Sequence, residues 1–198
     1  MRRNAFFAAA CAVVVLGSPS LARADGFVSP FLGVNFGGDA GQPLRQAIDE
    51  KTKVTFGLQA GQMGGGVFGF ELDIGYTPHF YGTGPAFDNN VLTIIPGVVL
   101  GVPLGGQTGF GVRPYVTAGA GLVRRQISLG QLFDLSQNDL AYSLGGGVMA
   151  FVSDHFGVRG DVRYIRNFRV DEFGISGIDF EKGTFNFGRA SIGAVFRY

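Results

Sequence analysis

Short segments in which apolar residues alternate with small or polar ones recur along this chain, and they restrict its fold more than any other feature. In residues 53–61 and 68–76 every even position is apolar, while Gly, Thr, Gln, Glu and Asp occupy most odd positions. A period of two is the repeat of a β-strand, whose successive side chains point to opposite faces. Together with similar segments near 27–37, 91–102, 112–123, 139–151, 156–166 and 185–198, they predict eight strands.

Composition supports strands that cross a membrane. The chain contains 34 Gly and 20 Phe, is 46% hydrophobic and is only 16% charged. Glycine disfavours helices and aromatic residues favour strands. Beyond residue 24 no apolar run reaches the roughly 18 residues of a spanning helix, and backbone inside a bilayer must satisfy its hydrogen bonds internally. We therefore predict an all-β fold, an eight-stranded antiparallel transmembrane up-and-down β-barrel formed by residues 25–198.

The first 24 residues have the pattern of a secretory signal peptide. Two arginines follow the first residue, residues 5–16 are apolar, and Ala22 and Ala24 supply a small-x-small cleavage motif. The apolar stretch is too short to cross a bilayer as a helix, which takes roughly 20 residues. We expect cleavage after Ala24, with an uncleaved anchor as the alternative.

Loss of this segment would change the expected partners and cofactors. It removes three of the 16 basic residues, none of the 15 acidic ones, and the only cysteine, Cys11. The remaining 13 basic and 15 acidic residues have no basic footprint for nucleic acid, and no thiol is left for disulfide or redox chemistry. We expect a monomeric bacterial outer-membrane protein whose partners are outer-membrane lipids and lipopolysaccharide.

The predicted connections differ in length in a regular way. Those near 62–66 and 152–155 are short, and that near 103–111 is intermediate. Four are long and carry most of the charge, at 38–52, 77–90, 124–138 and 167–183. Short turns at one end and long loops at the other are typical of the periplasmic and extracellular ends of such barrels. We therefore expect four long extracellular loops.

The less apolar face of the strands is rich in Gly, Ser and Thr, as at Gly119 and Ser143. Small residues suit the lumen of an eight-stranded barrel, which side chains just fill, whereas a solvated exterior would be rich in Lys and Glu. We therefore expect the apolar face to contact lipid. A soluble, lipocalin-like barrel with an apolar interior is the alternative.

Charged residues of both signs fall on this inward face. Glu71 and Asp73 share the inward parity of the third strand, and Arg159, Asp161 and Arg163 share that of the seventh. These strands lie opposite each other in a ring of eight, and buried charges need partners because desolvating each costs several kcal/mol. We predict an ion-pair network that plugs the lumen, with a solvated charged face as the alternative. The Arg-Gly-Asp tripeptide within it would be inaccessible to a receptor.

The end of the chain resembles the C-terminal β-signal of outer-membrane proteins. A polar residue, Ser191, is followed by Gly193, Phe196 and a final aromatic, Tyr198. Together with residues 103–106, 113–121 and 154–159, this segment resembles the small outer-membrane β-barrel family, similar to the OmpA transmembrane domain, OmpX and OmpW. The resemblance implies that the barrel-assembly machinery recognises Gly193, Phe196 and Tyr198. The family's interfacial aromatic girdle would be formed, without Trp, by residues such as Tyr76, Tyr115, Tyr142, Tyr164 and Tyr198.

Three functions follow, and we favour a non-enzymatic barrel with a plugged lumen and a structural, envelope-integrity or surface-interaction role. A narrow porin-like channel for small or hydrophobic solutes is the first alternative. A lipid A-modifying enzyme is the second, with His79, Asp88 and Ser128 as conceivable partners. No catalytic, cofactor-binding or metal site is expected, since His79 and His155 fall at opposite ends of the barrel.

Overall fold

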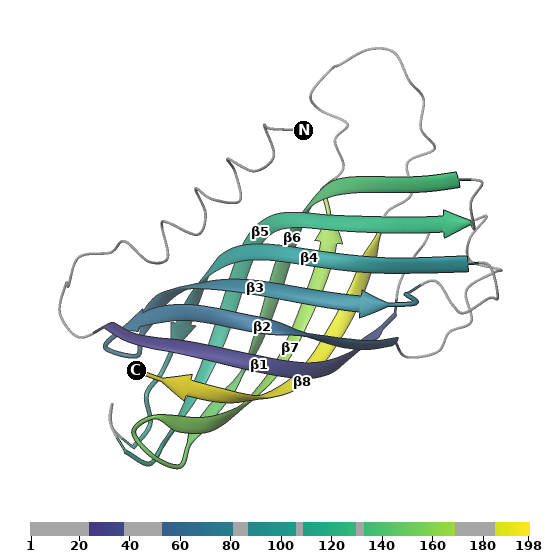
Figure 1. Ribbon diagram of the computed structural model, residues 1–198. Helices are drawn as coiled ribbons and strands as arrows, with labels where there is room; N and C mark the ends of the chain where they lie inside the picture. Colours follow the sequence, from purple (N-terminus) through teal and green to yellow (C-terminus); the bar gives the residue numbers. More distant parts are fainter. Residues whose placement is uncertain (1–23, 38–52, 81–86, 106–108, 130–132, 169–184) are drawn as a thin grey trace.

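Eight antiparallel strands form a closed barrel in chain order (Figure 1). The computed structural model describes residues 24–37, 53–80, 87–105, 109–129, 133–168 and 185–198. Among them no helix is long and apolar enough to span a membrane. The strands are β1 (Ala24–Phe36), β2 (Lys53–Gly64), β3 (Phe68–Pro78), β4 (Phe87–Gly101), β5 (Gly111–Leu129), β6 (Phe133–Phe151), β7 (Phe156–Asn167) and β8 (Asn186–Arg197). The predicted fold class is confirmed.

One parity rule describes the whole barrel, because odd-numbered residues face the lumen in all eight strands and even-numbered residues face outward. Large apolar side chains therefore lie on the outside, including Phe70 and Ile192, which are 64% and 69% exposed. The predicted orientation of the apolar face is confirmed. Such a surface suits lipid, since the strands pair with both neighbours around the closed ring.

The β2–β3 hairpin shows how a short connection is built. Gly65 and Gly66 take φ values of +57° and +71°, a region that residues with a Cβ rarely adopt. Val67 closes the turn by donating its backbone N–H to the Gly64 carbonyl at 3.1 Å. This tight turn lies at the same end of the barrel as the start of β1 and the end of β8 (Figure 1).

One predicted loop is wrong. Most of 124–138 forms the outer part of a long hairpin, because β5 and β6 each have 19 residues and pair as far as Leu129↔Phe133. The alternating pattern stops near Arg124 and Arg125 because a strand that has left the hydrocarbon has no apolar face to maintain. The loop predicted at 77–90 is also shorter, since β3 reaches Pro78 and β4 begins at Phe87. Residues 38–52, and most of 167–183, lie outside the described residues.

Candidate functional site: the filled lumen

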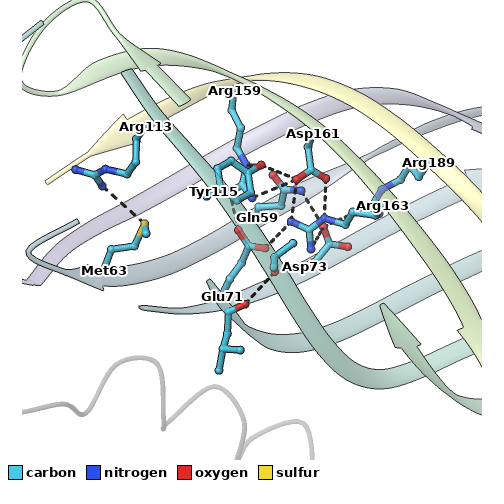
Figure 2. A network of polar contacts seen from close by, with 12 residues as sticks. Gln59, Met63, Glu71, Asp73, Arg113, Tyr115, Arg159, Asp161, Arg163 and Arg189 are labelled. Carbon is cyan, nitrogen blue, oxygen red and sulfur yellow. Dashed lines mark hydrogen bonds and ion pairs between the residues drawn. The ribbon is translucent and has the colours of Figure 1, made fainter. Parts of the chain in front are cut away.

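A layer of charged side chains crosses the middle of the lumen (Figure 2). Glu71 of β3 lies between two arginines of the opposite strand β7: its Oε2 is 2.6 Å from Arg159 Nη1, and its Oε1 accepts a hydrogen bond from Arg163 Nη2 at 2.5 Å. Arg163 Nε also donates to Asp161 Oδ1 at 2.6 Å. All four residues are buried, so the structure brings the two predicted groups of charges together across the barrel.

Asp73, the fifth predicted residue, has partners that sequence reasoning missed. Its Oδ2 accepts hydrogen bonds from Arg189 Nη2 at 2.5 Å and from Gln59 Nε2 at 2.9 Å, and lies 3.5 Å from Arg163 Nη1. With Arg189 the layer holds three carboxylates and three guanidinium groups, so its formal charge is balanced. Parity would have identified Arg189, because it lies two residues from Phe187 and four from Gly193 on the inward face of β8.

Tyr115 reaches this layer with its hydroxyl, while its ring belongs to the apolar layer below. Its predicted place in the girdle is therefore wrong. Its hydroxyl donates to Asp161 Oδ2 at 2.5 Å and accepts from Arg159 Nε at 2.7 Å. The Arg159 guanidinium also lies 4.5 Å from the Tyr115 ring centroid, within the range of a cation–π contact. An odd position in β5 faces inward, so residue type was a poorer guide than parity. The other four tyrosines predicted for the girdle occupy even positions: Tyr76, Tyr142, Tyr164 and Tyr198.

An apolar layer lies between the charged layer and the outer end. It consists of buried side chains from five strands and the segments flanking β3 and β8: Phe80, Val91, Ile95, Val123, Ala141, Ile165, Phe185 and Phe187. The three phenylalanine rings contact one another, with each pair of centroids 5.4 Å apart. Above them Arg125 forms an ion pair with Asp139 and lies 5.1 Å from the Phe185 ring centroid.

A second apolar layer occupies the periplasmic side of the charges. Its members are Phe27, Met63, Val99, Tyr115, Met149, Phe151 and Val195. Two buried arginines lie against the Phe151 ring, Arg197 at 4.5 Å and Arg113 at 5.5 Å from its centroid. Arg113 Nη2 is also 3.5 Å from Asp25 Oδ2. The charged layer is thus enclosed by apolar side chains on both sides.

Inward-facing glycines make room for these large side chains. A Cβ at Gly147 would lie 2.7 Å from the Tyr115 hydroxyl, and one at Gly145 would lie 2.7 Å from Arg163 Cγ. The Phe31 ring lies in the same way over Gly57, 2.6 Å from the place of a Cβ. Real Cβ atoms do not approach other atoms this closely. At these glycines a neighbouring side chain and a backbone carbonyl of the adjacent strand together take up the space.

Comparison with known proteins assigns the barrel to a family. The family described as outer membrane protein beta-barrel domain matches residues 8–197. The chain belongs to this family. It is accordingly a bacterial outer-membrane β-barrel protein. No curated protein matches the sequence.

Solved structures of other outer-membrane barrels share the family fold. Neisserial surface protein A is 15% identical with a TM-score of 0.63, over 88% of this chain and 97% of that one. OprG of Pseudomonas aeruginosa is 13% identical with a TM-score of 0.55, over 89% and 97%. Ail of Yersinia pestis is 15% identical with a TM-score of 0.54, over 90% and 100%. At these identities the likeness concerns the fold.

The predicted terminal residues of this family member lie along the seam where β8 pairs with β1. Gly193 lies opposite Phe31, and Phe196 opposite Val28, on the ladder that closes β8 against β1. Tyr198 exchanges two backbone hydrogen bonds with Gly26, at 3.0 and 3.2 Å. Ala24 is the first residue of β1, and Ala22 lies outside the described residues.

The residues considered for lipid A chemistry lie near the outer end. The backbone register places Asp88 of β4 opposite Ser128 of β5, and the side chains of both lie outside the described residues. His79 follows β3 with a φ of +51° and donates its backbone N–H to the Asn89 carbonyl at 2.7 Å. His155 occupies the β6–β7 turn at the other end.

Proposed function

We propose that this outer-membrane barrel is non-enzymatic, has a closed lumen, and acts through its outer surface in envelope integrity or surface interaction. The observation that carries the proposal is the sequence of layers inside the barrel, apolar, charged and apolar again. An eight-stranded lumen is only wide enough for side chains. Here, residues from strands on opposite sides contact one another in its middle, as Glu71 and Arg163 do at 2.5 Å.

Each layer opposes passage for a different reason. An ion entering the middle layer would have to displace a paired carboxylate or guanidinium, which would then be buried without a partner at a cost of several kcal/mol. A polar solute would first lose its hydration among the rings of Phe80, Phe185 and Phe187. Three inward-facing glycines that could have left gaps, Gly57, Gly145 and Gly147, are covered by Phe31, Arg163 and Tyr115 respectively. These features together support a plug.

Conductance in planar bilayers distinguishes a plugged barrel from a narrow channel. We expect the protein comprising residues 25–198 to show no sustained openings. A variant with Glu71, Arg159, Arg163, Phe187 and Phe151 all changed to Ala is expected to conduct, because it removes the cross-lumen contacts and a large ring from each apolar layer. A matched variant, Tyr164→Ala, changes the outward face of β7 and should stay silent. Stable openings in the unchanged protein would favour the channel and refute the plug.

The outer part of the barrel supports a surface role. The β5–β6 ladder continues to Leu129↔Phe133, well past the point at which β6 and β7 begin to pair, at Ala141↔Asn167. The Arg125–Asp139 ion pair joins the two strands where they rise above the apolar layer.

The enzymatic alternative is tested by mass spectrometry of lipid A from cells with and without the protein. We expect identical profiles, and a changed acyl pattern would contradict the proposal.

We also propose that residues 1–24 are an export signal removed after Ala24. Cleavage there would remove only the first residue of β1. It would keep Asp25, whose carboxylate contacts Arg113, and would leave the Gly26–Tyr198 hydrogen bonds intact. The N-terminal sequence of the protein recovered from the outer-membrane fraction tests this directly. Asp25 as first residue is expected, and retention of Ala22 and Ala24 in the recovered protein would contradict it.

A further inference from the structure

The outward face of the barrel carries very few charges. Across the strand residues whose side chains the structure describes, the even positions hold only two charged groups, Arg124 on β5 and Arg166 on β7. Both are cationic, and both lie toward the outer end of their strands. Every other described outward position is apolar, small or neutral. A face in contact with lipid normally carries no charge within the hydrocarbon, so two arginines at its outer edge call for an anionic partner at that level.

The ladders place the two arginines around one surface of β6. Arg124 lies opposite Asn138, and Arg166 lies opposite Tyr142, four residues nearer the periplasmic end. Strands of a barrel are tilted. Here, paired residues lie progressively nearer the outer end on passing from β5 through β6 to β7. The tilt therefore brings Arg166 closer to the height of Arg124 than the four residues on β6 suggest.

The surroundings of the pair have the character of a membrane interface. The Tyr142 ring contacts the exposed Phe168, with centroids 5.3 Å apart. Aromatic residues of this kind mark the boundary between hydrocarbon and headgroups. Below them the outward positions of β6 and β7 are apolar, as at Leu144 and Val162. Within the described residues neither Arg124 nor Arg166 makes an ion pair.

We propose that Arg124, Arg166 and the surface of β6 between them bind the phosphate groups of an anionic glycolipid, lipopolysaccharide, in the outer leaflet. Guanidinium groups hold phosphate oxygens in a bidentate manner, and Asn138 and Tyr142 present polar groups beside them. Lipid is the fitting occupant because the side chains project from the lipid-facing side at the edge of the apolar band. The inference rests on the membrane placement of the proposed function and adds a ligand to it.

The test measures retention of purified lipopolysaccharide by the protein comprising residues 25–198 in phosphatidylcholine nanodiscs. We expect Arg124→Gln and Arg166→Gln each to weaken retention about fivefold, and the double variant about twentyfold, from roughly one basic contact each. Lys53→Gln is the matched control, because it removes one positive charge at the same end from an inward-facing position. It should leave retention unchanged.

The same retention assay with other ligands identifies which chemical group is bound. Dephosphorylated lipopolysaccharide, phosphatidylglycerol and inorganic phosphate should all be retained weakly or not at all. Equal retention of the first would exclude phosphate recognition, and equal retention of either of the others would exclude a glycolipid site. Unchanged retention by the double variant would overturn the inference outright. Heat-dependent gel mobility of each protein reports folding separately. A wild-type protein that fails to insert into bilayers would refute the proposed function, whereas one that inserts and ignores lipopolysaccharide would refute only this inference.

Discussion

Removing Arg163 tests whether the charged layer holds the barrel together. Arg163 contacts all three carboxylates of the layer, Glu71 at 2.5 Å, Asp161 at 2.6 Å and Asp73 at 3.5 Å. Without it Glu71 keeps Arg159 at 2.6 Å and Asp73 keeps Arg189 at 2.5 Å. Breaking a buried pair typically costs 3–5 kcal/mol because one charge is left uncompensated. Since two of the three carboxylates keep a close partner, we expect Arg163→Ala to lower the free energy of unfolding by about 3 kcal/mol.

Adding Glu71→Ala to Arg163→Ala tests whether the loss of stability comes from an unbalanced charge in the layer. Asp161 suffers most from Arg163→Ala, because its next guanidinium, that of Arg159, is 3.6 Å away. The single variant leaves the layer with one excess negative charge, and adding Glu71→Ala restores the balance. The double variant should therefore lose about 2 kcal/mol less than the sum of the two single losses, a coupling in the range of residues that share one network.

Urea unfolding in detergent micelles free of lipopolysaccharide, followed by circular dichroism, is the appropriate measurement, because the chain has no Trp for fluorescence. Arg166→Ala is the matched control, since it removes the same side chain from the outward face of the same strand. We expect it to change the free energy of unfolding by less than about 0.5 kcal/mol. Additive losses for Arg163 and Glu71, within about 0.5 kcal/mol, would refute the view that the layer acts as a network.

Three further outcomes are expected. Gly147→Ala should lower stability by about 2 kcal/mol through overpacking, because the new Cβ would meet the backbone carbonyl oxygen of Gly160 and the Tyr115 side chain. Gly160→Ala, with no atom within 4 Å of the new Cβ, should be tolerated, and equal urea midpoints would contradict this. Tyr115→Phe removes a hydroxyl bonded to two charged groups and should cost about 1–3 kcal/mol, while Tyr164→Phe on the outward face should be neutral in the same assay. Deletion of Tyr198 removes two backbone hydrogen bonds to β1 and should reduce the folded, heat-modifiable protein in outer-membrane fractions; normal yields would argue against a role in assembly.

The fold was predictable because one physical requirement acts on the whole membrane-spanning part of the chain. A strand in contact with lipid on one face and with a narrow lumen on the other must alternate, and residues 53–61 and 68–76 do so without exception at their even positions. The β5–β6 extension was missed because that requirement ends where the strands enter water. At Arg124 and Arg125 consecutive positions are both charged, and the pattern no longer distinguishes strand from loop.

Within the lumen, the sequence predicts the residues that stand out as charged pairs on one strand face. It does not predict the residues whose role depends on their height along the barrel axis. Tyr115 was assigned by residue type to the interface, although its odd position gave its direction. Arg189 gives a weaker signal, because it lies between Gly188 and Ala190 and has no second charge two residues away on either side. Its partner Asp73 comes from β3, 116 positions earlier. No local pattern encodes a contact that depends on the closure of the ring.

The buried charges also bear on how the barrel selects its own register. Strand pairing slips in units of residues, and a slip of one residue exchanges the two faces of a strand. For β7 such a slip would turn Arg159, Asp161 and Arg163 toward lipid, where each arginine costs about 2–4 kcal/mol at mid-bilayer depth and the aspartate less. It would also leave Glu71 in the lumen without its arginine partners on β7. For a strand of Val and Gly alone the same slip would cost little. The charged layer therefore sets a larger free-energy difference between the native register of β7 and the register shifted by one residue than any outward-facing apolar residue does.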